Sequence, residues 1–221
     1  MTITVYYTEF TNNFSFQPES VLKNLEGYAK KTLIKCPAFT ENLKNTFLVN
    51  AVVDYELILE KGRIYSPLRD QEFFDKWVHI RDIDEGACTF AAPRILFIAD
   101  KPLELELKTA TYHSNGFTDN VTIVEGRYDI GRHFRPLEAA FMFKSSNKVV
   151  IELGKPLYYV RFNTNEKIKL VPFQYTPDIK NLTGNKFSFK GPRIMPLSYW
   201  YDMHERFYKK RLLKLIKESL L

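Results

Sequence analysis

The residues best suited to chemistry gather in one segment near the middle of the chain. Three arginines and a histidine lie within nine positions of one another, namely Arg127, Arg132, His133 and Arg135. Guanidinium groups present planar pairs of N–H donors, so two that converge can bind a carboxylate or a phosphate in a bidentate manner. The segment is therefore a candidate anion-binding site. The alternative is a polar loop whose arginines pair with Asp129 and neighbouring carboxylates.

A second candidate surface lies at the C-terminal end. From Ser198 onward there are six lysines and arginines and three acids, an excess of +3 out of the net charge of +6. The apolar residues that can share one helical face here are Met203, Phe207, Leu213, Ile216 and Leu220. A basic amphipathic helix of this kind binds a partner groove or an anionic membrane, or packs its apolar stripe on its own sheet. The candidate docking residues are Trp200, Phe207, Lys210, Arg211 and Lys214.

The histidines do not form a metal-binding pattern. Iron or cupin sites in β folds usually draw ligands from His-x-Asp or His-x-Glu, because alternate residues of a strand face the same side. The four histidines are His79, His113, His133 and His204. None has an acid or a second histidine two positions further on. The sequence therefore predicts no metal site.

Other catalytic signatures are missing as well. The sequence contains no phosphate-binding glycine loop, no Gly-x-Ser-x-Gly elbow and no Cys-x-x-Cys pair. We therefore assign no catalytic residue and no cofactor, and the sequence favours a protein that is not an enzyme.

Composition indicates one sizeable folded core. Of the 221 residues 45% are hydrophobic, which excludes a disordered chain. Two cysteines, Cys36 and Cys88, exclude a disulfide scaffold, and we expect both as buried thiols in a reducing compartment. No window approaches the roughly 18 apolar residues of a membrane span. The N-terminal residues are typical of a first strand rather than a signal peptide, so we expect a cytoplasmic protein.

Alternation of apolar and polar residues dominates the chain and predicts strands. The expected strands cover Phe47–Leu59, Arg63–Ser66, Ala87–Asp100, Leu103–Tyr112, Leu137–Phe143, Val149–Leu153, Leu157–Phe162 and Lys167–Phe173. The last four are short and separated by turn residues, a spacing typical of an antiparallel meander. Pro93 cannot donate a ladder hydrogen bond, so we expect it at an edge or a bulge.

Helical spacing of apolar residues is confined to three places. The expected helices run over Val21–Leu33, Asp70–Trp77 and Ser198–Leu220. Asp70 and Ser198 are suitable N-caps for the second and third.

These elements predict a mainly β fold, because strands outnumber helices and do not alternate with them. We expect an antiparallel β-sandwich or jelly-roll-like body with peripheral helices and a C-terminal amphipathic helix. The β-rich domain with its N-terminal helix covers residues 1–175, and residues 176–221 form a C-terminal extension with the basic helix.

Several stretches resemble uncharacterised proteins of tailed phages, especially phages of marine bacteria. They are Cys36-Pro37-Ala38-Phe39, Lys44-Asn45-Thr46-Phe47, Gly126 to Pro136, and Leu157-Tyr158-Tyr159-Val160-Arg161-Phe162. The resemblance covers Leu33 to Phe173 and lends no catalytic residues. It implies a viral protein, in the host cytoplasm or the virion, with a role in virion assembly or host interaction.

Two functions follow from the sequence. The first is a non-enzymatic phage-type protein that binds a protein partner, or assembles with itself, through the C-terminal helix. The alternative is a cupin or jelly-roll-type enzyme or binding protein that holds a small anionic ligand in the arginine segment. Nucleic acid is disfavoured, because the basic excess is confined to one helix.

Overall fold

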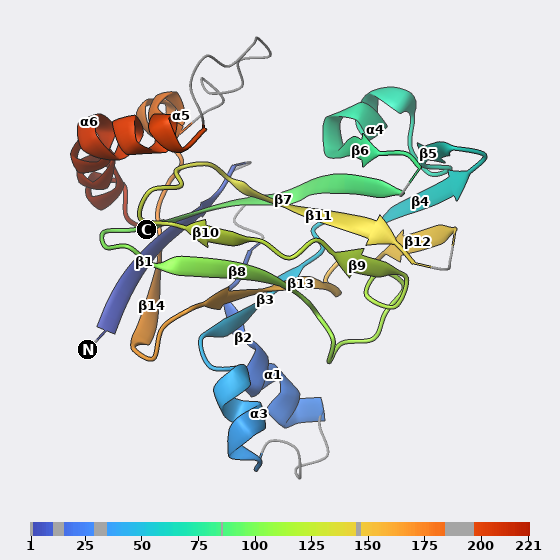
Figure 1. The fold of residues 1–221 in the computed structure, drawn as a ribbon, viewed down its shortest axis with the longest axis horizontal. Coiled ribbons are helices and arrows are strands. Elements are labelled where there is room, and N and C mark those ends of the chain that lie inside the picture. Colours follow the sequence, from blue (N-terminus) through green and yellow to red (C-terminus); the bar gives the residue numbers. More distant parts are fainter. Residues whose placement is uncertain (1, 11–15, 29–34, 85, 145–146, 184–196) are drawn as a thin grey trace.

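Strands provide most of the regular structure in the computed structural model, which describes all residues except 1, 11–15, 29–34, 85, 145–146 and 184–196 (Figure 1). The largest sheet, sheet A, has six strands. In order across the sheet these are β14 (Lys167–Pro172), β1 (Thr2–Glu9), β7 (Ala87–Ala99), β11 (Leu137–Phe143) and β9 (Val121–Ile123), and β6 (Val78–Asp82) also pairs with β7. The β1–β14 pair is parallel, whereas the other pairs of this sheet are antiparallel.

Two smaller antiparallel sheets complete the body. Sheet B has the order β10 (Arg127–Asp129), β8 (Glu104–Thr109), β13 (Pro156–Phe162), β3 (Thr46–Asn50) and β2 (Glu19–Ser20). Sheet C has the order β12 (Lys148–Ile151), β4 (Tyr55–Glu60) and β5 (Arg63–Tyr65). The prediction of a mainly β fold is confirmed.

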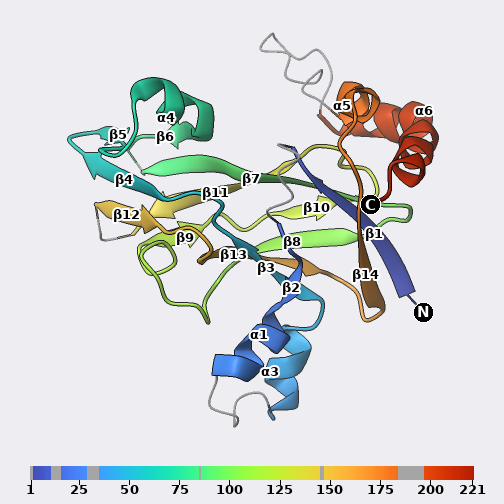
Figure 2. The same ribbon diagram turned by 180° about the vertical axis from the view of Figure 1, so that it is seen from behind.

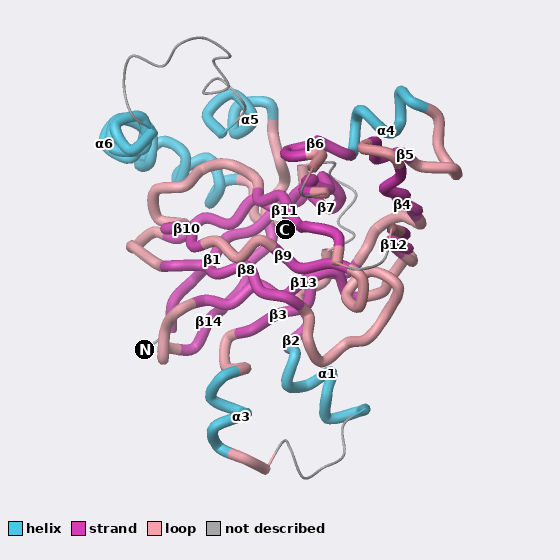
Figure 3. The backbone as a smooth tube through the Cα atoms, turned by 45° about the vertical axis from the view of Figure 1, so that its right-hand side comes forward, coloured by secondary structure: helices cyan, strands magenta, loops and turns pink. Residues whose placement is uncertain are grey.

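The helices lie at three separate places on the periphery (Figures 1 and 3). They are α1 (Val21–Tyr28), α3 (Pro37–Asn42), α4 (Gln71–Trp77), α5 (Pro177–Thr183) and α6 (Leu197–Glu218). The N-cap prediction for α4 is confirmed, since Asp70 Oδ1 accepts a hydrogen bond from the Phe73 N–H at 2.8 Å. The described part of α6 begins at Leu197, one residue before Ser198, and the side chain of Ser198 lies outside the described residues. The end of the predicted first helix, after Tyr28, lies outside the described residues.

The main core takes apolar side chains from all three sheets. Phe97 of sheet A lies edge-on to Phe162 of sheet B, with ring centroids 5.7 Å apart. Phe162 in turn contacts Phe47 on β3 at 5.8 Å. Because sheets A and B meet through these rings, the outer faces of both sheets remain for helices, loops or solvent.

A bulge in β7 keeps its apolar residues on the main core. Phe90 of β7 is opposite Ala139 of β11, and Ile95 is opposite Leu137. The β7 residues between Phe90 and Ile95 are therefore opposed by a single residue of β11. Pro93 lies within this bulge, which confirms the expectation for it. An irregular insertion of this kind changes which alternate positions face a given side. Phe90 before it and Ile95 after it therefore both belong to the main core.

The expected meander is wrong. The four strands from β11 to β14 belong to three different sheets, and β12 pairs with β4 while β14 pairs with β1. Local turn residues mark where a strand ends, but the partner is chosen by distant segments. The long strand expected over Phe47–Leu59 is also divided, because the chain leaves sheet B after Asn50 and enters sheet C at Tyr55.

Truncating the aromatic contact between the sheets should be costly. Phe97 is 1% exposed and also contacts Phe16 at 5.8 Å, so Phe97→Ala leaves a cavity in the main core. We expect a loss of about 3–5 kcal/mol in the free energy of unfolding, measured by chemical denaturation. Leu153→Ala is the control, because that side chain is 61% exposed. Equal losses for the two variants would contradict the interface between sheets A and B.

Candidate functional site

The C-terminal helix packs on its own sheet. Leu212 and Ile216 of α6 are fully buried in a second apolar cluster. The same cluster contains Tyr6 of β1 and Leu96 and Ile98 of β7, which alternate with the residues that face the main core. Figure 2 shows α5 and α6 together beside β1 and β14. Of the alternatives for this helix, the structure shows the one in which its apolar stripe packs on its own sheet.

Backbone contacts fix the end of α6. The Gln174 N–H donates to the Ser219 carbonyl at 2.8 Å, and the Leu221 N–H donates to the Pro172 carbonyl at 3.2 Å. An isolated antiparallel bridge joins Phe173 and Leu220 between them. The last residues thus pair with the segment that continues β14.

A buried histidine holds the first half of α6. His204 Nε2 donates to the Leu182 carbonyl of α5 at 2.6 Å, and its ring lies 4.9 Å from that of Phe134. Burial lowers the pKa of His204, while the Leu182 carbonyl acts in the opposite direction. His204 is therefore a neutral link between the two C-terminal helices at pH 7.

Arg132 connects the arginine segment to α6. Its guanidinium pairs with Asp202, and its Nε lies 3.2 Å from Glu205 Oε2. Two carboxylates thus balance the charge of this cation. In this structure Arg132 thus attaches the loop before β11 to the helix.

His133 lies in an aromatic environment next to Arg132. Its ring lies 5.0 Å from Tyr128 and 5.5 Å from Tyr201 of α6. Burial lowers the pKa of His133 to about 4, and the nearby charge of Arg135 adds to the effect. His133 is therefore neutral at pH 7 and brings no positive charge to an anion.

Arg127 is directed to a different part of the molecule. Its Nε lies 2.9 Å from Glu106 Oε1 on the neighbouring strand β8 of sheet B. Asp129 pairs with backbone rather than with an arginine, since its Oδ1 accepts from the N–H groups of Gly131 and Leu103. The structure thus directs Arg127 to sheet B and Arg132 to α6.

Most of the predicted docking residues lie on the outward face of α6. Phe207 is 61% exposed, and Lys210, Arg211 and Lys214 are exposed as well. Trp200 belongs to α6, but its side chain lies outside the described residues.

The predicted apolar face of the helix is wrong in part. The sequence places Phe207 on one face with Ile216, yet the contact with sheet A buries a different arc, which consists of Leu212, Ile216 and His204. Apolar residues span more than half of the helix circumference, so periodicity alone leaves several faces possible. Sequence reasoning missed His204 and Leu212, and the matching apolar positions of β7 were the available signal.

The remaining reactive groups are scattered over the described chain. His79 Nε2 lies 3.2 Å from Arg94 Nη2, whereas His113 Nδ1 lies 2.6 Å from the Tyr159 hydroxyl on another sheet. Within the residues that the structure describes, no three His, Cys, Asp or Glu side chains are grouped to hold a metal ion.

The two cysteines differ in their surroundings. Cys88 is buried, and burial raises the pKa of its thiol to about 12, so it is not a nucleophile at neutral pH. Cys36 is exposed at the start of α3, which contradicts the expectation that both thiols are buried.

Comparisons with protein-family models, curated proteins and solved structures find no match to this chain. Among the described helices, none combines the length and the apolar composition needed to cross a membrane.

Acidification should destabilise the contact between the arginine segment and α6. The folded-state pKa of His133, about 4, lies below the ordinary value of 6.5. Between pH 6.5 and 4 the unfolded chain therefore binds more protons at this histidine than the folded chain does. The contribution of His133 to the free energy of unfolding is fully present above pH 6.5 and falls as the pH approaches 4.

The measurement is the free energy of unfolding between pH 7.5 and 5 for the original protein and for His133→Gln. Linkage gives at most about 1.4 kcal/mol per pH unit, so the variant should lose about 2 kcal/mol less over this interval. Parallel curves for the two proteins would show that His133 ionises as freely in the folded state as in the unfolded one.

Proposed function

We propose that this protein is a non-enzymatic binding protein that docks the outward face of α6 on an acidic surface of another protein. The observation that carries the proposal is the charge of this face. Five cations are exposed there, namely Arg206, Lys210, Arg211, Lys214 and Lys217. Glu218, which lies 3.9 Å from Lys214, is the one acid of α6 that is not already paired with Arg132.

The outward face of α6 is basic because two of the three acids of the helix pair with Arg132. Asp202 and Glu205 pair with Arg132, and Glu205 also lies 3.7 Å from Lys209. Cations four residues apart, such as Lys210 and Lys214, lie along one row of the helix surface. Opposite charge on a partner accelerates association with such a row and orients it.

Phe207 favours a protein over a membrane or a nucleic acid. It is an exposed aromatic ring beside Arg211, and buried aromatic and arginine side chains dominate the energetics of protein interfaces. The apolar stripe of α6 is occupied by sheet A, so the helix has no further apolar face to insert into a bilayer. The basic face is also confined to one helix, whereas nucleic-acid proteins usually extend it over the fold.

The remaining sequence-based expectations are retained in this proposal. We take the body to be a β-sandwich or jelly-roll-like domain over residues 1–175, supported by the apolar contact between sheets A and B, and residues 176–221 to be its extension. The phage resemblance supports a role in virion assembly or host-protein interaction, in the host cytoplasm or the virion.

The alternative of a cupin or jelly-roll-type protein with one arginine-lined pocket has less support. Arg132 already holds two carboxylates, and His133 is neutral at pH 7. Arg127 and Arg132 also turn to different partners, Glu106 of sheet B and the acids of α6.

Neutralising the basic face should weaken binding to an acidic polypeptide. The variant is Lys210→Gln/Arg211→Gln/Lys214→Gln, and the probe is a poly-glutamate peptide followed by fluorescence anisotropy. Three exposed charge contacts should lower the affinity about tenfold. Phe207→Ala should also weaken binding, because the ring is expected to become buried in the complex.

The matched control neutralises exposed cations elsewhere, Lys35→Gln/Lys61→Gln/Arg63→Gln. We expect its affinity to stay within about twofold of the original protein. An equal loss in both variants would indicate unspecific attraction by net charge. A different result would be that the protein binds a DNA duplex or phosphatidylglycerol vesicles more tightly than the peptide, and that the α6 variant loses that binding. This result would contradict a protein partner and would identify the polyanion as the ligand of α6.

A further inference from the structure

A polar groove crosses the outer face of sheet B. It consists of two adjoining cavities of about 340 and 370 Å³, which share Lys108 and Glu125 in their walls. The shared residues make the two cavities one elongated site. Its position is independent of α6, since α3 and α6 lie on opposite sides of the β body (Figures 1 and 2).

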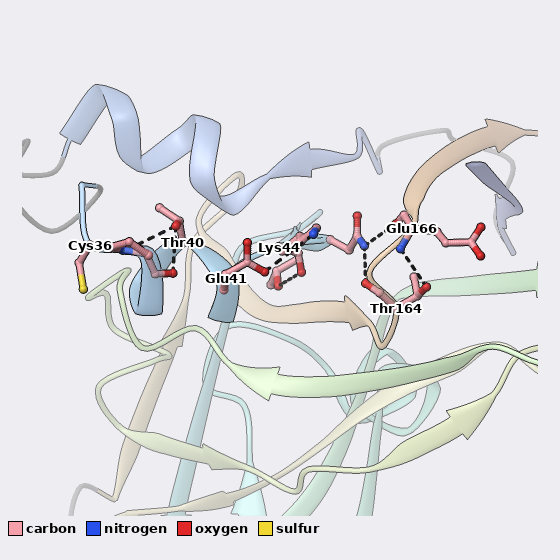
Figure 4. Close-up of polar contacts among 9 residues, drawn as sticks. Cys36, Thr40, Glu41, Lys44, Thr164 and Glu166 are labelled. Carbon is pink, nitrogen blue, oxygen red and sulfur yellow. Dashed lines mark hydrogen bonds and ion pairs between the residues drawn. The ribbon is translucent and has the colours of Figure 1, made fainter. Parts of the chain in front are cut away.

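One wall of the groove is the end of α3, which provides Asn42 and Leu43. This wall is held in place by Asn45, whose side-chain amide donates to the carbonyl oxygens of Thr164 and Glu166, each at 2.8 Å. Figure 4 shows Thr164 and Glu166 beside the end of this segment. The left-handed backbone of Asn45, with φ of 53°, lets the chain turn from α3 into β3.

The opposite wall is the connection from β9 to β10. The Val124 N–H donates to the Ala140 carbonyl of sheet A at 2.8 Å, and the Leu107 N–H donates to the Gly126 carbonyl at 3.0 Å. The connection is thereby attached to both sheets, and it places Glu125 at the middle of the groove.

An acid between two arginines forms the floor. Glu106 on β8 is directly opposite Arg127 on β10 and Arg161 on β13 in the strand register. Glu106 is 7% exposed and bonds to Arg127 Nε at 2.9 Å, with Lys108 at 3.5 Å. This contact fixes the direction of the Arg127 guanidinium, whose side chain is still 70% exposed.

Both arginines retain donors for a ligand. Among the described residues, the Nη atoms of Arg127 have no hydrogen-bond or ion-pair partner. Arg161 has one weak contact there, from Nη1 to Asn42 Oδ1 at 3.4 Å. Two guanidinium groups that flank the same buried carboxylate can therefore bind an anionic group of a ligand in the groove.

The other groups of the groove add acceptors and an aromatic ring. Glu125 is exposed, with no ion pair to another described residue. Tyr112 is 41% exposed and is held edge-on by Phe39 of α3 at 5.0 Å. In total four cations and two carboxylates line the groove, so it is positive on balance but not uniformly so.

We propose that this groove binds an acidic oligosaccharide. A uronate carboxylate satisfies the arginine donors, and the sugar hydroxyls donate to Glu125 and accept from the lysine and amide groups. A phosphodiester chain has few hydroxyl donors, so it offers little to pair with the two carboxylates of the groove, whereas the hydroxyls of a uronate chain can donate to them. Tyr112 provides a face on which a pyranose ring can pack.

The test is titration calorimetry of the whole protein with tetragalacturonate, and with maltotetraose as a neutral match. Arg161→Gln should lower the affinity for tetragalacturonate about tenfold or more, since a charged hydrogen bond is lost. Glu125→Gln should also weaken binding, because a hydroxyl loses its charged acceptor. We expect maltotetraose to bind more weakly than tetragalacturonate.

Two controls separate this site from the rest of the surface. Arg63→Gln removes an exposed arginine of β5 and should leave the affinity unchanged. The α6 variant Lys210→Gln/Arg211→Gln/Lys214→Gln should also retain saccharide binding, so a failure of the docking proposal does not affect this result. Thermal unfolding of each variant verifies that it is folded.

Three outcomes would overturn the proposal. The first is that neither tetragalacturonate nor a second acidic saccharide, 3′-sialyllactose, binds at millimolar concentration. The second is binding that Arg161→Gln and Glu125→Gln both leave unchanged, which places the saccharide elsewhere. The third is preferential binding of oligothymidylate that is lost in Arg161→Gln, which would make the groove a nucleic-acid site.

Discussion

The structure depends on a central strand that is apolar on both of its faces. From Cys88 to Ala99, every residue of β7 except Arg94 is buried. One face, with Ile95 and Phe97, must be covered by the opposing sheet, and the other, with Leu96, requires a second layer. Burying such a strand removes a large apolar area from water, which is the dominant favourable contribution to folding. The C-terminal helix supplies the second layer, and this explains why its apolar stripe is not available to a partner.

This constraint also determines which surfaces remain for function. Once Leu212 and Ile216 cover β7, helical geometry turns Lys210, Arg211 and Lys214 toward solvent. The acids near the start of α6 are used by Arg132, which leaves the outward face basic. On the other side of the body, α1 and α3 cover only part of sheet B, and the polar groove occupies the rest. The two candidate surfaces are thus what remains after the apolar faces have been covered.

Local features of this fold were predictable, and long-range pairing was not. The bounds of β11 agree with the expected Leu137–Phe143, and both the cap at Asp70 and the bulge at Pro93 follow from the chemistry of single residues. The partner of each strand depends on segments far away in the chain, so the expected meander failed. The mostly apolar run of β7, broken only by Thr89 and Arg94, was the signal for burial on both faces, because one-sided strands alternate instead.

The same distinction applies to the candidate sites. Proximity in sequence grouped Arg127 with Arg132, but a three-residue strand and a tight turn at Gly131 direct them to different sheets and helices. The arginine that does join Arg127 is Arg161, which lies on a strand 34 positions away. Glu106 brings them together only because the register of β10, β8 and β13 places all three residues in one row. Register depends on the buried face of each strand, so the polar row on the outer face is a consequence of the core. A charge cluster of this kind becomes visible only when the pairing of the strands is known.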